Sequence, residues 1–392
     1  MRVVHVITRL IVGGAQENTL ASVVGLQERH GWEVRLISGP TYGPEGSLED
    51  VAAAVPGLLE VESHLIRPVH PWHDLLAWIR LVHRFRELRP DLVHTHSGKA
   101  GFLGRLAAHR AGVPVIVHTI HGPSFGAFQG FLANAAFRWA ERQAGRVTTH
   151  FVAVADAMTR QYLQAGIGRP EQYTRIYSGF DLKPFLQAQN DPAWRARIGL
   201  SREELVVGKI ARLFKLKGHD DLLAVTPSLV RRCPRLRVVF VGDGAWRRRL
   251  ERRAQALGVA NHVRFAGLVP PAEIPRWIGI MDVVVHLSRR EGLPRALPQA
   301  LAAGKPVVAY DCDGAPEVCR PGETGFLVTP GDRAGLEESL LRLLTDPNLR
   351  AQLGTRGRAW VRQHFDVRIM VDQLHELYLR LLADKRDWKA GS

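Results

Sequence analysis

Residues 3–37 read VVHVITRLIVGGAQENTLASVVGLQERHGWEVRLI and contain the pattern that decides the fold class. The predicted elements are, in order, a buried strand at Val3 to Ile7, a turn at Gly13-Gly14, a helix at Ala15 to Arg29 and a second strand at Glu33 to Ile37. A strand, a crossover helix and a second strand form a right-handed βαβ unit. The start of the chain therefore predicts a parallel sheet and an α/β fold.

The same alternation of strands and helices continues through the first half of the chain. Further strands are predicted at Asp91 to Thr95, Pro114 to Thr119, Thr149 to Val154 and Thr174 to Tyr177. The intervening helices are predicted at Asp74 to Leu88, Gly101 to Ala111 and Ala155 to Ala165. This series completes one Rossmann-like domain, to which we assign residues 1–182.

A second series follows a polar stretch from Lys183 to Leu200. Its strands are predicted at Val206 to Ile210, Arg237 to Val241, Val263 to Phe265, Asp282 to His286 and Pro306 to Ala309. Its helices are predicted at Asp220 to Arg232, Trp246 to Leu257, Arg295 to Ala303 and Arg333 to Leu344. We assign residues 183–365 to a second Rossmann-like domain and expect the two domains to face each other across a cleft. The long helix in residues 366–392 is expected to cross back and pack on the first domain.

Composition narrows the function classes. The 392 residues carry a net charge of +15, which attracts polyanions such as nucleic acids, anionic bilayers and diphosphate-bearing substrates. The three cysteines form neither a CxxC pair nor a zinc-binding spacing, and they point to a reducing compartment. The first residues lack the features of a signal peptide, and no apolar run approaches the length of a membrane span. We expect a cytoplasmic protein.

The segment SRREGLPRALPQALAAGKP, residues 288–306, carries the most specific signal. A predicted strand ends here in a loop that contains Glu291 and Gly292, and a helix then starts, so free backbone N–H groups and the positive helix end meet at one place. This arrangement predicts a diphosphate site. Glu291 cannot bind a phosphate, so we expect it to bind hydroxyl groups of the sugar that the diphosphate carries.

Two cations follow another predicted strand of the second domain. Arg212 and Lys217, in GKIARLFKLKGH (residues 208–219), can neutralise a diphosphate leaving group without a metal. Gly242 lies in a turn that would let the backbone approach a ligand closely, although a tight strand-to-helix turn explains this glycine equally well.

These segments, in this order, resemble the retaining GT-B glycosyltransferases of family 4, the group 1 type, over nearly the whole chain. The resemblance also rests on GGAQ (residues 13–16), HTHSGKAG (94–101), HTIHG (118–122) and SGFD (178–181). It implies that Arg212 and Lys217 hold the donor diphosphate, that Glu291 contacts hydroxyls of the transferred sugar, and that His121 lies near that sugar. It also implies that Gly13 and Gly14 close over the phosphate. Gly292, Leu293 and Pro294 complete the donor-binding loop.

One position departs from the family pattern. A second Glu commonly follows the first by eight positions and binds the nucleotide ribose, but Gln299 occupies that position here. The Gln amide oxygen can still accept a hydrogen bond from a ribose hydroxyl, without the strength that a charge adds. We assign Gln299 to the ribose, and the change favours a non-catalytic sugar-nucleotide-binding protein as one alternative.

The chain has 17 histidines, of which His121 is the strongest candidate for the site. It follows a predicted strand and precedes a glycine, which would place it over the cleft. His94 and His96 point to the same side of a strand, as metal ligands can, but no third ligand is evident in the sequence. We expect no metal and no cofactor other than the nucleotide sugar as co-substrate.

Two basic amphipathic segments suggest where the acceptor binds. Residues 74–89 and 123–146 interleave aromatic or aliphatic side chains with arginines. Such helices can lie at an anionic membrane surface, where a polyprenyl-diphosphate-linked acceptor would be found, although ordinary packing on a sheet explains them as well. A peripheral association with the cytoplasmic face of the membrane follows as an expectation.

The sequence thus predicts a hexosyl- or N-acetylhexosaminyltransferase that uses a UDP-linked sugar and builds a glycan or lipid-linked polysaccharide. A sugar-nucleotide 2-epimerase is a second alternative, because such enzymes share the two-domain architecture. A nucleic-acid-binding protein is a third, but the sequence contains none of the small helical or zinc modules that such proteins use. We therefore expect no nucleic-acid partner.

Overall fold

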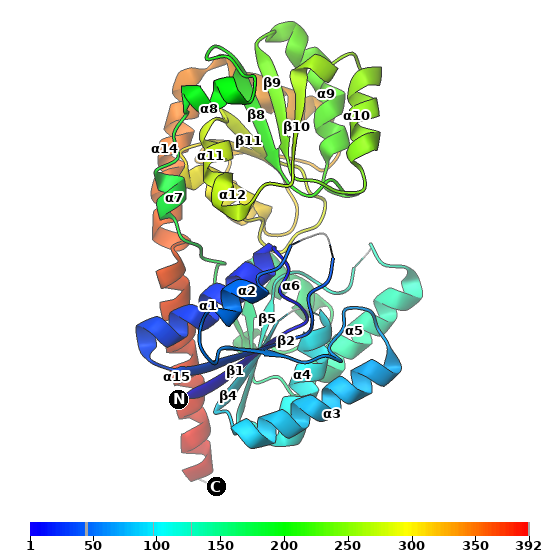
Figure 1. Cartoon of the computed structure of the whole chain (residues 1–392), viewed down its shortest axis with the longest axis vertical. Coiled ribbons are helices and arrows are strands. Elements are labelled where there is room, and N and C mark those ends of the chain that lie inside the picture. The colour runs from blue at the N-terminus through cyan, green and yellow to red at the C-terminus, as the bar shows by residue number, and fades with distance from the viewer. Residues whose placement is uncertain (44–45, 97, 127, 391–392) are drawn as a thin grey trace. The chain divides into compact units, whose positions relative to one another are not determined.

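The computed structural model describes residues 1–43, 46–96, 98–126 and 128–390, with side chains described to residue 385, so Ser97 of the HTHSGKAG segment lies outside the described residues. The chain divides into two compact units (Figure 1). Unit 1 comprises Met1–Phe180 together with the C-terminal segment that begins at Val367, and unit 2 comprises Asp181–Asp366.

Unit 1 contains a seven-stranded parallel sheet of order β3-β2-β1-β4-β5-β6-β7. Its strands are β1 (Arg2–Ile7), β2 (Glu33–Ser38), β3 (Leu59–Val61), β4 (Leu92–His96), β5 (Val115–Ile120), β6 (His150–Ala153) and β7 (Tyr173–Arg175). Its helices are α1 (Gly14–His30), α2 (Glu49–Ala53), α3 (Pro71–Leu88), α4 (Gly98–Ala111), α5 (Phe131–Arg146), α6 (Asp156–Gln164) and α15 (Val367–Ala390). Val and Ile predominate in the central strands β1 and β5 because both faces of a parallel sheet are buried.

The C-terminal helix α15 packs on α1 and on the core of unit 1. The two helices approach closely at Gly25, where an added Cβ would lie 2.4 Å from Val371 Cγ2. At the edge of this contact, Asp372 accepts hydrogen bonds from Arg29 at 2.8 Å and pairs with His30 at 2.9 Å. The predicted return of the last helix to the first unit is confirmed.

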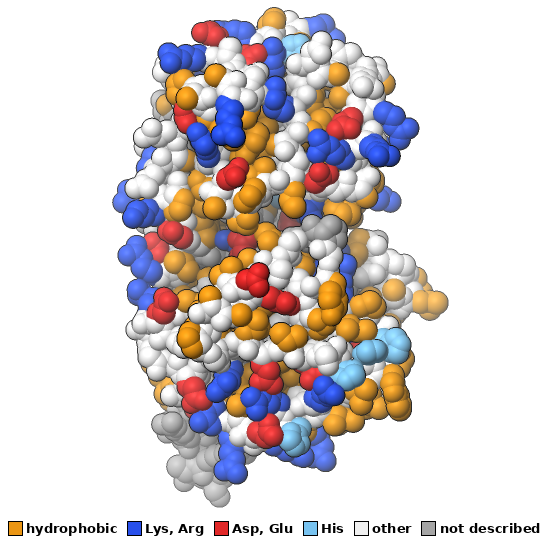
Figure 2. Space-filling model, viewed as in Figure 1, with side chains coloured by type: hydrophobic (Ala, Val, Ile, Leu, Met, Phe, Trp, Pro, Cys, Tyr) orange, Lys and Arg blue, Asp and Glu red, His pale blue; other side chains and the backbone are white. Residues whose placement is uncertain are grey.

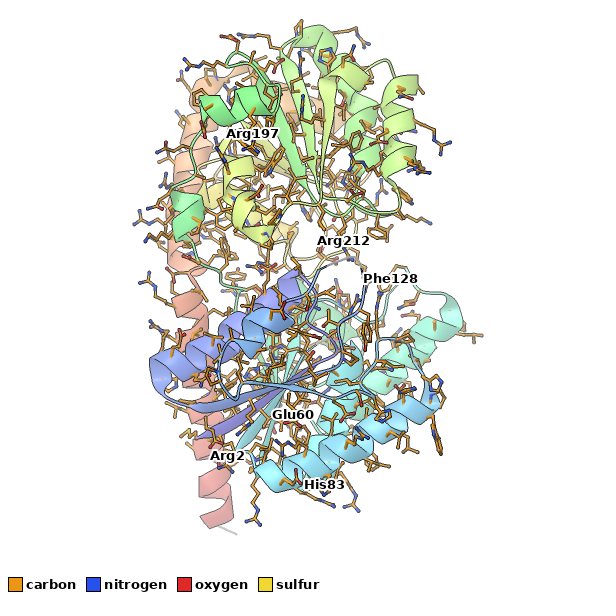
Figure 3. The ribbon with its side chains drawn as sticks, viewed as in Figure 1. Arg2, Glu60, His83, Phe128, Arg197 and Arg212 are labelled. Atoms are coloured by element: carbon orange, nitrogen blue, oxygen red, sulfur yellow. The ribbon has the colours of Figure 1, made fainter. Side chains whose placement is uncertain are left out.

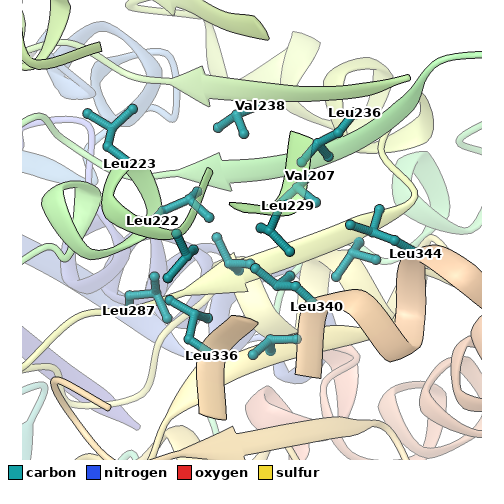
Figure 4. Packing of buried hydrophobic residues seen from close by; sticks show 14 of the residues in the cluster. Val207, Leu222, Leu223, Leu229, Leu236, Val238, Leu287, Leu336, Leu340 and Leu344 are labelled. Atoms are coloured by element: carbon teal, nitrogen blue, oxygen red, sulfur yellow. The ribbon is translucent and has the colours of Figure 1, made fainter. Parts of the chain in front are cut away.

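Unit 2 contains a six-stranded parallel sheet of order β10-β9-β8-β11-β12-β13. Its strands are β8 (Leu205–Ile210), β9 (Leu236–Val241), β10 (Val263–Gly267), β11 (Val283–His286), β12 (Val307–Tyr310) and β13 (Gly325–Val328). Its helices are α7 (Lys183–Leu186), α8 (Pro192–Arg197), α9 (His219–Arg232), α10 (Arg247–Ala256), α11 (Ile274–Gly279), α12 (Ala296–Ala302), α13 (Arg333–Thr345) and α14 (Pro347–His364). One apolar cluster between the sheet and helices α9 and α13 forms its core (Figure 4).

Both sheets therefore share one strand order up to their sixth strand, and in each the order reverses once. The reversal lies between β1 and β4 in unit 1, and between β8 and β11 in unit 2. The predicted pair of Rossmann-like α/β units is confirmed. Within the described part of the chain, no helix combines the length and the hydropathy that crossing a bilayer requires.

Candidate functional site

The reversal of strand order in unit 2 brings three of the predicted residues to one edge of the sheet. Arg212 and Lys217 follow β8, and Glu291 follows β11. Ligands of open parallel sheets bind outside the carboxyl ends of the strands at such a reversal, because the loops diverge there and leave a crevice. The topology alone thus places two cations and one carboxylate where a ligand is expected.

Glu291 is held by groups from three segments. Its Oε1 accepts a hydrogen bond from Ser288 Oγ at 2.9 Å and pairs with Lys217 Nζ, while its backbone N–H donates to Asp313 Oδ2 at 2.7 Å. Burial by itself would raise the pKa of the Glu291 carboxyl, but the positive charge of Lys217, the interaction with His286 and the hydrogen bonds from Lys217 and Ser288 together outweigh burial and hold this pKa below its usual range. Glu291 is therefore an anion at neutral pH, and 24% of its side chain remains exposed to a ligand.

The loop that carries the two cations is strained at Leu216. This residue has φ +70, a left-handed conformation that a branched side chain adopts at a cost of about 1–3 kcal/mol. Its carbonyl accepts a hydrogen bond from the Arg289 N–H at 2.9 Å, which ties the loop after β8 to the loop after β11. The strained turn thus places Lys217 directly against Glu291.

Arg212 lies at the start of the same loop and is exposed (Figure 3). Its guanidinium carbon is 5.2 Å from the centre of the Phe214 ring, a cation–π distance that orients the side chain. The site therefore offers an exposed cation at Arg212 and a second, partly buried cation at Lys217, which pairs with Glu291.

Gly242 brings the loop after β9 against the loop after β8. It has φ +134, and an added Cβ would lie 2.2 Å from the carbonyl oxygen of Ala211, next to Arg212. Its N–H donates to the Gly267 carbonyl at 2.9 Å. The contact between two backbones requires glycine here, and it fixes the position from which Arg212 projects.

The predicted donor loop leads from Glu291 into helix α12. Gly292, Leu293 and Pro294 are buried, and the Gly292 carbonyl accepts a hydrogen bond from the Gly314 N–H at 3.0 Å. Gln299 lies on α12 and is partly exposed. The helix begins at Ala296 and has seven residues, so its dipole contributes less than a long helix would.

Three buried polar side chains interact electrostatically with Glu291 or Lys217, and the sequence interpretation missed all three. Lys209 Nζ and both ring nitrogens of His219 and of His286 are buried, without a hydrogen-bond partner among the described residues. His286 Nε2 approaches Glu291 Oε1 only to 3.6 Å. Burial, followed by the charge of Lys217, lowers the pKa of Lys209 to about 7. Burial likewise lowers the pKa of His219 to about 2 and that of His286 to about 3.

The remaining predicted residues belong to unit 1. Gly13 precedes α1 and its carbonyl accepts the Glu17 N–H at 2.9 Å, while Gly14 is the first residue of the helix. An added Cβ at Gly13 would lie 3.0 Å from Gln16 Oε1, so little space remains beside this loop. A 17-residue helix that starts without a side-chain cap presents free N–H groups, which suit an anion.

His121 follows β5 and is partly exposed. Its Nε2 lies 3.0 Å from Nδ1 of the buried His96, and burial lowers the pKa of His121 to about 3. On the same side of the sheet, His94 contacts Tyr378 Oη through Nδ1 and Thr119 Oγ1 through Nε2, the latter at 2.6 Å. His121 is therefore a neutral ring at physiological pH, anchored to a buried histidine.

An exposed apolar surface lies on helices α3 and α5 of unit 1. Phe131 and Leu132 at the start of α5 are 86% and 81% exposed, and Trp139 follows them on the same helix. On α3, Trp72 and other apolar side chains are exposed as well, while the residues that face the core are buried. Figure 2 shows hydrophobic side chains gathered over these two helices.

Known proteins resemble this chain in sequence and in structure. Residues 13–179 match the family model described as glycosyl transferase 4-like domain, and residues 190–360 match the model described as glycosyl transferases group 1. A GDP-mannose-dependent alpha-(1-6)-phosphatidylinositol monomannoside mannosyltransferase from Mycolicibacterium smegmatis is 34% identical over 79% of this chain and 82% of its own length. A UDP-Gal:alpha-D-GlcNAc-diphosphoundecaprenol alpha-1,3-galactosyltransferase from Escherichia coli is 27% identical over 82% of this chain and 83% of its own.

Two solved structures are similar to this chain over nearly its whole length. Anabaena HepE in complex with UDP-glucose has a TM-score of 0.81 and 25% identity, covering 96% of this chain and 99% of that chain. Sucrose-phosphate synthase from Thermosynechococcus elongatus has a TM-score of 0.79 and 20% identity, covering 98% of this chain and 100% of that chain. The second likeness shows the fold, and the first joins the fold to a chain that binds a sugar nucleotide.

Proposed function

The chain belongs to the group 1 glycosyltransferases of the GT-B fold, which use sugar-nucleotide donors, and from this premise we propose a retaining hexosyl- or N-acetylhexosaminyltransferase with a UDP-linked donor. Its proposed acceptor is a glycan or a polyprenyl-diphosphate-linked saccharide. The observation that carries the proposal is the contact between Lys217 and Glu291 beside Arg212, because it joins a diphosphate-binding cation to a sugar-binding carboxylate.

Arg212 and Lys217 bind the donor diphosphate in this proposal. Both are cations at the carboxyl end of β8, and charge-assisted hydrogen bonds to phosphate oxygens are about twice as strong as neutral ones. Lys217 pairs with Glu291 before the donor arrives, and on binding it bridges the diphosphate and the carboxylate. Two positive charges neutralise the departing diphosphate, so the reaction requires no metal.

Glu291 binds hydroxyls of the transferred sugar. An ionised carboxylate accepts hydrogen bonds and donates none, which suits sugar hydroxyls and repels phosphate. Gln299 accepts a hydrogen bond from a ribose hydroxyl, and Gly13 and Gly14 approach the phosphates with the free N–H groups of α1. His121 contacts the sugar as a neutral ring.

The preference for UDP rests on the named ligands of similar proteins. The E. coli relative uses UDP-Gal, and the HepE structure holds UDP-glucose, whereas the M. smegmatis relative uses GDP-mannose. Both relatives are named for alpha linkages, and an α product from an α-linked sugar nucleotide requires retention at the anomeric carbon.

Retention follows from a front-face substitution. The bond between the anomeric carbon and the diphosphate oxygen breaks, and its electron pair stays on the diphosphate. The acceptor oxygen forms the new bond from the same side, and its proton passes to a diphosphate oxygen. Arg212 and Lys217 stabilise the developing charge, and positioning of the acceptor supplies much of the remaining rate enhancement.

The exposed surface of α3 and α5 is the proposed membrane contact. Apolar side chains such as Phe131, Leu132 and Trp139 can enter the interface of the cytoplasmic leaflet, where arginines of α5 meet anionic headgroups. A lipid-linked acceptor would reach the enzyme from this surface. Absence of binding to anionic vesicles at low salt would contradict this part of the proposal.

Thermal unfolding with UDP, GDP, ADP and their common sugar conjugates tests the donor site without an acceptor. A ligand at 100 times its Kd adds about 2.7 kcal/mol of stability. We expect UDP and UDP-sugars to raise the Tm of the wild type and to lose this effect in an Arg212→Ala, Lys217→Ala double variant. An Arg231→Ala, Lys215→Ala double variant, which removes the same charge at two exposed residues, serves as the control.

The outcome also separates the competing functions. A larger shift with GDP would move the donor class to guanine nucleotides. No shift with any nucleotide would mean that Gln299 marks a lost ribose site. Binding without transfer to any acceptor, but with an epimerised donor, would identify an epimerase.

A further inference from the structure

Three histidines of unit 1 form a hydrogen-bonded chain that ends in the protein interior. His121 Nε2 lies 3.0 Å from His96 Nδ1, and His96 Nε2 lies 2.9 Å from His5 Nδ1. His5 on β1 and His96 on β4 are buried, whereas His121 at the end of β5 is partly exposed. Each contact joins two ring nitrogens, so each requires one N–H and one lone pair.

The direction of the two hydrogen bonds is coupled. Burial keeps all three rings neutral, and a neutral imidazole carries a single N–H. If His5 donates from Nδ1, then His96 must donate from Nδ1, and His121 carries its proton on Nδ1 as well. If both hydrogen bonds have the opposite direction, all three rings carry their proton on Nε2. The buried end of the chain therefore sets the tautomer of the exposed end.

The surroundings of His5 select one of the two directions. His5 Nε2 is buried and has no hydrogen-bond partner in the described part of the chain. Orphaned N–H groups are rarer in protein interiors than under-satisfied acceptors, so the proton is better placed on Nδ1, where it bonds to His96. The orphaned atom is then a lone pair.

We propose that His5 and His96 are positioning residues that hold His121 as the Nδ1–H tautomer, so that its ring offers an N–H donor to an oxygen of the transferred sugar. This inference rests on the proposed transferase function, because it assigns His121 to the sugar. Without the hydrogen bond from His96, the His121 ring can present a lone pair to the sugar instead of an N–H, and the hydrogen bond from His121 to the sugar is lost in a fraction of the molecules.

The same cluster could be taken for a metal site, since His5, His94 and His96 each place a ring nitrogen within 4.8 Å of the other two. Both nitrogens of His94 are already engaged, by Tyr378 and by Thr119. The 2.9 Å between His5 and His96 is a hydrogen-bond length. The contacts of these rings thus favour the hydrogen-bonded chain over a metal.

Nitrogen NMR of the full chain labelled with ¹⁵N-histidine tests the proposal in the absence of donor, because long-range proton–nitrogen correlations report which ring nitrogen is protonated. His121→Gln assigns the His121 signals. We expect the wild type to show His121, His96 and His5 protonated on Nδ1 at pH 7. A wild-type His121 protonated on Nε2 would overturn the proposal, and so would a stoichiometric metal that leaves when His5 is replaced by Phe.

The variant His96→Phe keeps the stacked ring but removes both hydrogen bonds. We expect the Nε2–H form of His121 to appear, and kcat/KM for sugar transfer to fall about tenfold, the value of one hydrogen bond. The Kd for UDP should stay unchanged, because UDP has no sugar to transfer. An unchanged His121 tautomer in this variant would contradict the proposal.

His118→Leu is the matched control. His118 is buried in the same sheet but faces the other side, where it contacts Thr95 Oγ1 at 2.9 Å. Its loss should leave the His121 tautomer as in the wild type. If the wild type transfers no sugar at all, the proposed function fails, while the NMR result still decides the tautomer.

Discussion

The two units differ in whether their buried polar side chains have hydrogen-bond partners. In unit 1, His94 and His96 are hydrogen-bonded to histidine, threonine or tyrosine side chains through both ring nitrogens, and the neighbouring His5 is bonded through Nδ1 while its Nε2 has no partner among the described residues. In unit 2, Lys209, His219 and His286 have no such partners among the residues that the structure describes. Both groups of side chains nevertheless lie at or near the carboxyl ends of central strands. In each sheet this is close to the place where the strand order reverses.

The difference separates a network that supports the fold from one that is incomplete without a ligand or water. A satisfied buried network stabilises a single arrangement of its side chains, whereas each unsatisfied buried group costs about 1–3 kcal/mol. Such a cost is retained where function requires it, and the incomplete cluster is the one coupled to Lys217 and Glu291. Three sets of substitutions test this contrast.

The largest expected effect is on activity, at the carboxylate beside the incomplete cluster. Glu291→Gln keeps the shape of the side chain but removes the charge that orders Lys217 and accepts from the sugar. We expect kcat to fall about 100-fold or more, as when one preorganised electrostatic contact is removed, with a Kd for UDP within about threefold of the wild type. Steady-state kinetics and calorimetry measure the two values.

Glu323→Gln is the control for this change. Glu323 lies in unit 2, is exposed, and pairs with Arg320 at 3.0 Å. Its replacement should leave both values unchanged. If Glu291→Gln instead weakened UDP binding and left kcat intact, Glu291 would act on the nucleotide and not on the sugar.

A second pair of substitutions compares the two interiors directly. His94→Leu leaves the buried Tyr378 hydroxyl and Thr119 hydroxyl without their partner, and should destabilise unit 1 by about 2–4 kcal/mol. His219→Leu removes no hydrogen bond, and because relief of its two unpartnered ring nitrogens offsets the lost contact with the Phe240 ring, the stability of unit 2 should change by less than about 1 kcal/mol. Differential scanning calorimetry measures both. Equal losses in the two variants would mean that His219 has a partner, such as an ordered water.

The sequence predicted most of the strands and helices but not these clusters. The apolar run Val3 to Ile7 and the run Val206 to Ile210 predicted strands correctly, because alternation and β-branched residues report burial. His5 and Lys209 lie within these same runs at buried positions, but a single polar residue does not change the apolar pattern, so nothing in the sequence indicated that either is part of a buried cluster. Strands β3 and β13 were missed, because they have only three and four residues and carry too short a signal.

The contacts within the site depend on strand pairing, which local sequence does not report. His5 and His94 lie opposite each other in the register of β1 and β4, although 89 positions separate them. Lys217 and Glu291 are separated by 74 positions. Sequence reasoning selected Lys217 and Glu291 from the motifs around them, but their direct contact follows from the reversal between β8 and β11. Lys209 and His286 carried no such motif.

The smallest expected effect is on the pH dependence of stability, at Lys209. Its pKa is lowered to about 7 in the folded chain, so the unfolded chain binds the additional proton between about pH 7 and its ordinary value of 10.5. The cost of burying the ammonium is therefore complete below pH 7 and disappears as the pH rises through this window. Lys209→Met removes that cost. We expect the variant to be more stable than the wild type by about 2 kcal/mol at pH 6.5, with a difference that shrinks toward pH 9.5.

Urea unfolding at pH 6.5, 8.0 and 9.5 measures this difference, with Lys215→Met as the control, because Lys215 is an exposed lysine of the following loop. The control should change stability by less than about 0.5 kcal/mol at each pH. A Lys209→Met variant that is less stable than the wild type at pH 6.5 would show that the ammonium has a bound counterion. In that case Lys209 would be satisfied as His94 and His96 are in unit 1, and the contrast between the two clusters would fail.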